Sequence, residues 1–477
     1  MSDKTQAETI GSRTTTGKAL RVNLDMNIYG AFAEIGAGQE VARHFFQAGR
    51  ASQTIAKTIS AYDMIYSDEI YGKEKNGRYV VESRLNRMLE KEYSLLQRRL
   101  SEHRGNKTTF FAYANTVATG SAESPKCHGW MGIRFQKKPG AEHNDIVLHV
   151  RMMDQRRLQQ QEALGMLGVN LVYSAFYHSE DPTDFMNFLV DGLKQGQIII
   201  DVIKFTGPAF KNFNNQKMNI ELVKRGLAEA VLFGPQTGTG SDLVLNIADT
   251  VWGKGLLIQR GFYRPITQTH LDVMSKGYEQ LKHEIKQQKL KSSDIFPIME
   301  ITSEFDIDME EFWHRVQVIT SLGYYVLISN FKYFYELKKF FRNYTQAPLV
   351  MVMSARHLEN LFDPEKYKQL EGHIFEALGK LLDAQTKLYI YPHKNDQLCL
   401  TTKSFFPGKA VNHLYRHFIE NSQILDISGC DDTDTYYHSS DVQSMIEKKE
   451  KGWEKLVPTP VADYLKKNKL WGFGKSK

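Results

Sequence analysis

Residues 261–272, which read G-F-Y-R-P-I-T-Q-T-H-L-D, carry side chains that could hold a phosphate. The apolar run 256–258 before them is typical of a buried strand, and a helical pattern follows from Leu271. A strand, a Gly/Pro turn and a helix N-terminus bearing Thr267 and His270 would place hydroxyl, imidazole and backbone N–H groups around one anion. The segment therefore predicts a phosphate site at a strand end.

Residues 261–270 resemble the first motif of the HxGH nucleotidylyltransferases, in particular the adenylyltransferases that act on nicotinate or nicotinamide mononucleotide or on phosphopantetheine. In that family a strand ends in a glycine turn, an aromatic residue and a proline, followed by Thr or His, any residue, Gly and His. Thr269 stands at the Gly position here. The resemblance implies that His270 and Thr267 are catalytic residues. They would stabilise the phosphates of Mg²⁺-bound ATP while AMP passes to a mononucleotide phosphate.

The same resemblance implies where the cofactor, ATP, would bind. The family's second motif is a Ser/Thr-rich turn followed by Arg, and its nearest counterpart is a compressed Ser-Ala-Arg after the apolar run 349–353. No metal ligands from the protein are expected. The cofactor-binding residues implied are Gly261, Phe262, Arg264, Ser354 and Arg356.

A structural interpretation of the same segment stays open. Gly261 and Pro265 would then shape a corner between a strand and a helix, and Thr267 or Thr269 would cap the helix. In that case the segment would carry no phosphate chemistry.

A second glycine turn, Gly36 to Gly38, leaves similar alternatives. It would either feed a packed helix or hold an anion at that helix's N-terminus, supplemented by Arg43 and Lys57.

The cysteines and the nearby histidines lack the spacing of a metal site. Three scattered cysteines also show no disulfide spacing, which favours a reducing cytoplasm. The residues concerned, for which we expect structural roles, are Cys127, Cys399, Cys430, His128, His143 and His149.

The elements that must position the candidate residues alternate along the second half of the chain. Helical stretches separate short apolar runs there, which predicts an α/β fold with a mostly parallel sheet flanked by helices. Ligands of such a sheet bind outside the carboxyl ends of its strands. An N-terminal helical segment and a short antiparallel meander over 110–152 precede it. The strands expected are 198–205, 230–233, 256–258, 295–301, 324–329, 349–353 and 387–391.

Composition shifts along the chain predict its domain organisation. We expect a disordered tail over 1–20 and an N-terminal α+β domain over 21–195. An α/β domain with the candidate nucleotide site should follow over 196–430, then a helical tail over 431–477.

Composition also excludes some classes of protein. The 477 residues are 42% hydrophobic and 24% charged, which is typical of a globular protein. A net charge of +6 is too small to indicate a nucleic-acid partner. The sequence shows neither a secretory signal nor a membrane-spanning run, so we expect a cytoplasmic protein without membrane contact. The whole chain resembles a bacterial cytoplasmic family of unsettled activity.

Two functions from different classes follow. The first is a nucleotide-binding, adenylyltransferase-like enzyme that acts on a nucleotide or another small phosphorylated substrate. The second is a non-catalytic assembly or scaffold protein that forms a homo-oligomer. An aromatic content of 12% and the apolar helical stretch 165–177 favour this second function.

Overall fold

A computed structural model describes residues 14–74, 77–119, 127–236, 243–287, 295–303, 308–395, 397–432 and 435–473. The chain divides into two compact units, Met1–Glu229 (unit 1) and Ala230–Lys477 (unit 2). This division lies after the boundary at 195/196 expected from the sequence, because the strand Ile198–Thr206 pairs within the sheet of unit 1.

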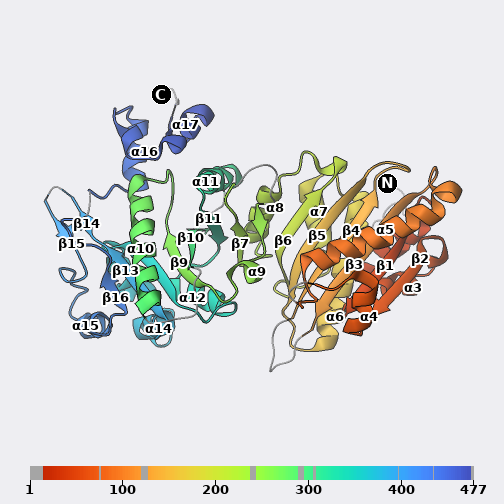
Figure 1. The fold of residues 1–477 in the computed structure, drawn as a ribbon, viewed down its shortest axis with the longest axis horizontal. Coiled ribbons are helices and arrows are strands. Elements are labelled where there is room, and N and C mark those ends of the chain that lie inside the picture. The colour runs from red at the N-terminus through yellow and green to blue at the C-terminus, as the bar shows by residue number, and fades with distance from the viewer. Residues whose placement is uncertain are drawn as a thin grey trace. The chain divides into compact units, whose positions relative to one another are not determined.

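Unit 1 contains a six-stranded sheet of order β2-β1-β3-β4-β5-β6 (Figure 1). The pairs β1–β2 and β1–β3 are parallel, and β3 to β6 pair antiparallel. The predicted meander is confirmed. The strands are β1 (Ile28–Gly36), β2 (Ile55–Ala61), β3 (Thr109–Ala118), β4 (His128–Gln136), β5 (His143–Met152) and β6 (Ile198–Thr206).

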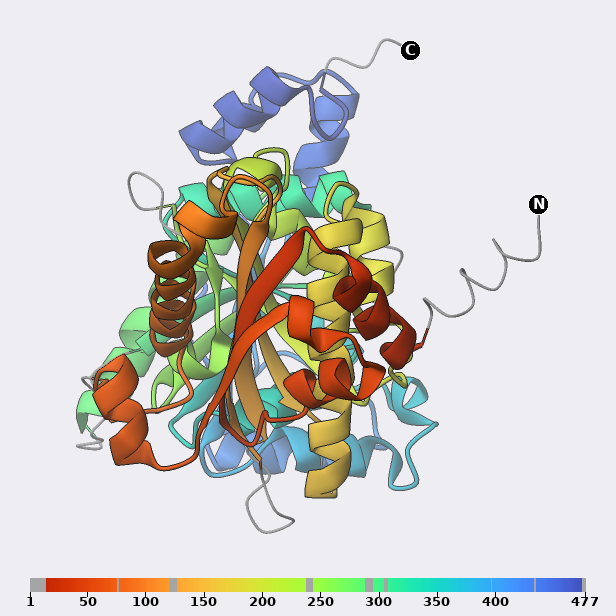
Figure 2. The ribbon, with the colours of Figure 1, turned by 90° about the vertical axis from the view of Figure 1, so that its right-hand side faces the viewer.

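Helices cover both faces of this sheet, with α5 on one face and α2, α3 and α6 on the other (Figure 2). Helix α6 approaches α3 closely, since a Cβ atom at Gly168 would lie 2.3 Å from Val41 Cγ2. The apolar stretch 165–177 is therefore core of its own unit. The helices are α2 (Thr15–Leu24), α3 (Val41–Ala48), α4 (Met64–Tyr71), α5 (Glu82–Arg104), α6 (Arg157–Tyr177), α7 (Pro182–Leu189) and α8 (Asn215–Lys224), with short 3₁₀ turns at Ala51–Gln53 and Pro208–Phe210.

The N-terminal segment holds helices, as expected, together with two strands that its helical pattern did not predict. Strand β1 is buried on both faces, and its Gly30 leaves room for the Phe111 ring of the neighbouring strand β3. Such a central strand lacks the alternation that marks a half-buried strand.

Unit 2 contains an eight-stranded sheet of order β16-β13-β12-β9-β10-β11-β7-β8. The six strands from β16 to β11 run parallel, while β7 pairs antiparallel with both β11 and β8. The α/β fold with mostly parallel strands is thus confirmed. The strands are β7 (Ala230–Phe233), β8 (Val244–Leu245), β9 (Gly255–Arg260), β10 (Ile295–Thr302), β11 (Tyr325–Ser329), β12 (Leu349–Ser354), β13 (Thr386–Tyr391) and β16 (Ile424–Asp426).

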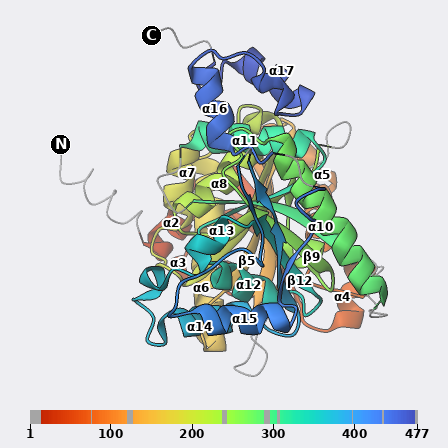
Figure 3. The ribbon, with the colours of Figure 1, turned by 90° about the vertical axis from the view of Figure 1, so that its left-hand side faces the viewer.

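One long helix, α10, packs on β9, β10 and β12, and the core on the other side of the sheet includes residues of α12, α13, α14 and α15. Helix α16 begins beside the N-terminal end of α10 (Figure 3). The helices are α9 (Ile247–Val251), α10 (Gln268–Gln287), α11 (Met309–Ser321), α12 (Phe334–Arg342), α13 (His357–Leu361), α14 (His373–Leu381), α15 (Asn412–Glu420), α16 (Ser439–Glu447) and α17 (Thr459–Asn468), with 3₁₀ turns at Pro364–Tyr367 and Trp453–Lys455.

The strand order places a topological switch point between β9 and β12. These strands are neighbours, yet the chain continues from β9 to β10 on one side and from β12 to β13 on the other. The connections leave their carboxyl ends in opposite directions, which opens a crevice where α/β proteins bind ligands. The turn after β9 and the residues after β12 flank this point.

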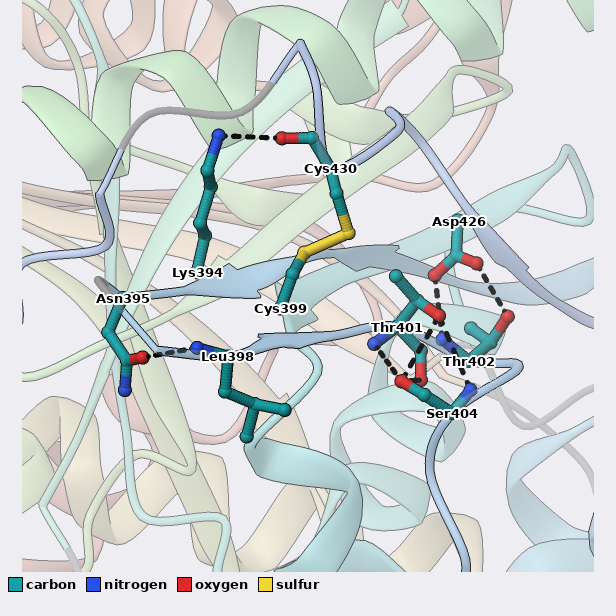
Figure 4. The surroundings of a disulfide bond; sticks show 9 residues. All are labelled: Lys394, Asn395, Leu398, Cys399, Thr401, Thr402, Ser404, Asp426 and Cys430. Carbon is teal, nitrogen blue, oxygen red and sulfur yellow. Dashed lines mark hydrogen bonds between the residues drawn. A yellow bond between two sulfur atoms is a disulfide. The ribbon is translucent and has the colours of Figure 1, made fainter.

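A disulfide corrects the expectation of unpaired cysteines. Cys399 and Cys430 are bonded, with Cα atoms 6.1 Å apart (Figure 4). Cys399 lies in a two-stranded ribbon, β14 (His393–Lys394) and β15 (Cys399–Leu400), and Lys394 donates to the Cys430 carbonyl at 2.8 Å. The two cysteines are 31 positions apart in the sequence, so no short motif predicts the pair. Among the described helices, none is both long and apolar enough to cross a membrane.

Candidate functional site

The turn after β9 is a packed corner. The Tyr263 ring is buried, and its hydroxyl donates to the Gln259 carbonyl at 2.7 Å. A Cβ atom at Gly261 would lie 2.8 Å from that ring, so the glycine makes room for Tyr263. The peptide bond between Arg264 and Pro265 is cis.

Thr267 and His270 bond to each other at the start of α10. The Thr267 N–H donates to His270 Nδ1 at 3.0 Å, and the His270 N–H points back to the Thr267 hydroxyl at 3.4 Å. This reciprocal pairing has the form of a capping box, with His in place of the usual Glu or Gln. The structural interpretation of this segment, in which Thr267 caps the helix, therefore fits the geometry observed. Both side chains are buried.

Burial also fixes the charge of His270. Together with the positive charges of His438 and His357, burial lowers the His270 pKa to about 3. The imidazole is thus neutral at physiological pH and brings no positive charge to a phosphate.

A C-terminal segment covers the turn. Thr267 donates to the Tyr437 carbonyl at 3.3 Å, and the Ser439 hydroxyl donates to the Pro265 carbonyl at 2.7 Å. The Leu456 carbonyl accepts from the backbone of Gln268. Residues 436–439 thereby cover Pro265 and Thr267, while Phe262 of the same turn stays exposed.

The other predicted cofactor-binding residues divide into two groups. Ser354 ends β12 and Arg356 follows it, and both lie across the switch point from the turn, with Ser354 buried and Arg356 exposed. Phe262 is 69% exposed beside β9. Arg264 instead pairs with Glu311 of α11 at 3.3 Å. Four of the residues predicted to bind a cofactor therefore lie at one edge of the sheet: Gly261, Phe262, Ser354 and Arg356.

Three histidines that were not predicted as site residues gather at the same edge. His357 follows β12, His393 follows β13, and His438 precedes α16. The rings of His393 and His438 are 5.3 Å apart, and the Tyr436 ring lies 5.2 Å from His393 and 4.7 Å from His438. We call His357, His393 and His438 the histidine cluster.

Each histidine of this cluster has one buried ring nitrogen without a hydrogen-bond partner in the described residues: Nδ1 of His357, Nδ1 of His393 and Nε2 of His438. Buried polar atoms of this kind normally have partners, so an external group is the natural complement. Groups of three or more His, Cys, Asp or Glu placed to hold a metal do not occur among the described residues.

The electrostatics of the cluster favour an anion. Burial and the charges of His438, His393 and Arg356 together lower the His357 pKa to about 4, against a hydrogen bond to the Ser354 backbone that raises it. Burial, His438 and Arg356 likewise lower the pKa of His393, while Asp441 and Glu359 oppose them. The lowered pKa values keep these histidines neutral near pH 7, and an anion bound beside them would raise those pKa values.

Only part of the histidine cluster could be recognised from the sequence. His393 follows the predicted strand 387–391, and His357 comes three residues after β12. His438 sits in a connection with no motif, so it could be found only from the fold.

The Gly36 turn of unit 1 does not expose a free anion site. The buried Glu34 carboxylate accepts from the backbone N–H groups of Val41 at 3.0 Å and Ala42 at 3.4 Å, at the start of α3. The N–H groups at the start of the helix are thus satisfied by the protein's own carboxyl group. The proposed supplements are paired elsewhere, Arg43 with Glu40 and Lys57 with Glu92.

Two histidines of unit 1, His128 and His149, take part in a chain of polar contacts. His128 Nδ1 lies 3.1 Å from His149 Nε2, and His149 Nδ1 lies 2.5 Å from Asp201 Oδ1. Arg151 bonds to both Asp201 and Glu229. The sheet positions of these residues agree with the structural role expected for His128 and His149.

Comparisons with known proteins add little to this geometry. No family model matches the chain, and no curated protein matches it. Solved structures that match include a competence/damage inducible protein, CihA, from Agrobacterium tumefaciens. It is 19% identical, with a TM-score of 0.25, and the match covers 34% of this chain and 94% of that one. Proteins of the competence-damaged protein (CinA) superfamily also match. The one from Enterobacter cloacae is 10% identical (TM-score 0.26; 34% and 90% covered), and the one from Klebsiella pneumoniae is 11% identical (TM-score 0.26; 37% and 97% covered). At these scores they carry no argument about activity.

The resemblance of residues 261–270 to the HxGH nucleotidylyltransferases is wrong. The matching structures named above are titled as competence/damage-inducible and CinA proteins, not as nucleotidylyltransferases. In the structure, Thr267 and His270 are buried, bonded to each other and covered by residues 436–439. Gly261 and Pro265 shape a corner in this fold, and their similarity to the motif is local.

Proposed function

We propose that unit 2 binds a small phosphorylated ligand, with a mononucleotide as the expected class, at the histidine cluster. The observation that carries this proposal is the set of three buried ring nitrogens for which the described part of the chain supplies no hydrogen-bond partner. They gather at the carboxyl edge of a parallel sheet, beside its switch point.

The chemistry of the edge suits a phosphate. A neutral imidazole can donate one N–H, a protonated one donates two, and a guanidinium offers a planar fork of donors. Arg356 is exposed beside His357. An anion bound between them would offset the mutual repulsion that lowers the pKa values of His357 and His393.

A base or other flat ring would have an aromatic partner at the same edge. Phe262 is 69% exposed directly after β9, and stacking on an exposed ring contributes about 1–3 kcal/mol per base in nucleic-acid complexes. This observation favours a mononucleotide over phosphate alone.

The experiment is a panel of inorganic phosphate, AMP, Mg²⁺-ATP and a pyridine mononucleotide, read by thermal shift and calorimetry at pH 6 and pH 8. We expect at least one ligand to stabilise the protein, with tighter binding at pH 6 because binding favours protonated histidines. Arg356→Ala should weaken binding about 10- to 100-fold, the effect of losing a hydrogen bond to a charged group. Lys409→Ala, which removes another exposed cation of unit 2, is the matched control. Absence of any shift at both pH values would rule the proposal out.

Transfer of AMP from ATP to a bound mononucleotide remains a prediction beyond binding. Release of pyrophosphate that requires both ligands is its assay. Binding without pyrophosphate release would leave unit 2 as a ligand-binding unit.

A further inference from the structure

Strand β2 is an open edge of the unit 1 sheet. It pairs with β1 on one side, and no described strand lies on its other side. An edge strand presents a row of backbone N–H and C=O groups that can pair with another strand.

This edge lacks the features that usually prevent such pairing. Its sequence, I-A-K-T-I-S-A, contains no proline and one charge. That charge, Lys57, is paired with the buried carboxylate of Glu92 at 2.5 Å. The one register irregularity lies opposite Gly30 and Ala31, at the start of the pairing, so the strand is regular from Lys57 to its end. Natural edges are more often protected by charges, proline or bulges.

Large apolar side chains are exposed beside the same edge. Directly after β2, Tyr62 is 78% exposed and Ile65 is 73% exposed, and Met64 and Tyr66 are also exposed. On the side of α3, Phe46 is 53% exposed. Phe46 also borders a cavity of about 490 Å³ that reaches Thr58 and Ser60 of β2. Clustered exposed apolar residues of this kind mark interaction sites.

We propose that β2 pairs antiparallel with β2 of a second copy of this chain, so that the two sheets join across a two-fold axis. The charges that flank the strand favour a second copy. Arg50 before β2 and Asp63 after it are both exposed. Antiparallel pairing brings the start of one strand beside the end of the other, so Arg50 of each copy lies near Asp63 of the other, whereas parallel pairing would bring like charges together. A two-fold contact needs this kind of self-complementary surface.

The exposed apolar residues would be buried in the same contact. Tyr62 follows the strand directly and Ile65 lies in the first turn of α4, so in the antiparallel arrangement they lie near Arg50 and the start of β2 in the other copy. The dimer would thus combine backbone hydrogen bonds with apolar burial, as strand addition at sheet edges does.

The test is light scattering of the full-length chain across 0.1–100 μM, a range chosen to span ordinary dimer affinities. We expect a species of twice the 54.9 kDa chain mass. Arg50→Glu and Asp63→Arg should each weaken the dimer about 10-fold or more, and the double variant should restore it, because the charges are exchanged.

Two further variants separate this contact from other surfaces. Ile65→Lys should weaken the dimer at least as much, while Leu158→Lys, at a residue 61% exposed on α6, should leave it intact. Thermal melts of each variant identify those that fail to fold. Among the variants that fold, recovery of the dimer in the double variant shows that residues 50 and 63 lie close together across the contact. A monomer at all concentrations, or a dimer that none of the β2 variants weakens, would overturn the proposal.

Discussion

The Nδ1 atom of His149 lies 2.5 Å from Oδ1 of Asp201, where β6 carries one residue more than β5. His149 pairs with Val202 and Val150 with Ile200, so Asp201 is the extra residue of a bulge. Bulges redirect side chains, and this one turns a carboxylate onto a buried imidazole. Burial raises the Asp201 pKa, but the charges of His149 and Arg151 outweigh it, and the pKa lies below its ordinary value.

Asp201→Asn should destabilise unit 1 by about 3–5 kcal/mol, because it leaves Arg151 and His149 without their buried partner. Urea unfolding at pH 7 measures the loss. Glu180→Gln, at a side chain that is 90% exposed, is the control and should change stability by less than about 0.5 kcal/mol. The carboxylate's contribution is present above the unfolded pKa near 4 and is lost as the pH falls further. Equal stabilities of the two variants would show that the bulge does not need its charge.

The buried carboxyl group of Glu34 should give the stability of unit 1 the opposite dependence on pH. Burial raises its pKa to about 8, against hydrogen bonds from Val41 and Ala42 that lower it. The folded state thus retains a proton that the unfolded state loses above about pH 4.5, so stability falls as the pH rises from 4.5 to 8.

Glu34→Gln keeps the acceptor and removes the titration, so its stability should vary less over this window. The difference from the unchanged protein should grow by up to about 1.4 kcal/mol per pH unit. Denaturant melts at pH 5, 6.5 and 8 measure it, with Glu40→Gln as a control nearby. Parallel curves for Glu34→Gln and the unchanged protein would contradict the expectation.

Much of unit 2 could be predicted from its sequence, since strands buried on both faces read as apolar runs such as 256–258 and 349–353. The carboxyl ends of these predicted strands then placed Gly261 and Ser354 at one edge of the sheet. Strand β1 was not predicted because its glycines and alanines suggested no alternation. The histidine cluster and the Cys399–Cys430 bond join segments far apart in the sequence, and only the folded chain brings them together.

His270 should make unit 2 sensitive to acid. Burial lowers its pKa to about 3, so the unfolded state binds a proton below about pH 6.5 that the folded state does not. Stability is therefore full above pH 6.5 and declines as the pH falls toward 3. His270→Asn keeps an acceptor for the Thr267 N–H without titrating, so its stability should decline less steeply below pH 6.5. An unchanged slope in thermal melts between pH 7 and 4.5 would count against this assignment.

The disulfide should stabilise unit 2 by on the order of 3–4 kcal/mol, because it closes a long loop in the unfolded chain. The double variant Cys399→Ser/Cys430→Ser should lose that amount in denaturant melts. Dithiothreitol provides the control, since it should destabilise the unchanged protein and leave the double variant as it is. Equal destabilisation of both proteins by the reductant would show that it acts on something other than this disulfide.

The same bond makes a closed ring of the chain between Cys399 and Cys430, and this ring contains α15 and β16. A protease that cuts once inside the ring would produce two polypeptides that remain joined through sulfur. Such a nicked molecule would migrate at full length on a non-reducing gel and separate into two bands only after reduction. The outermost parallel strand of unit 2 would therefore stay tethered after a cut that would release it from an unbridged chain.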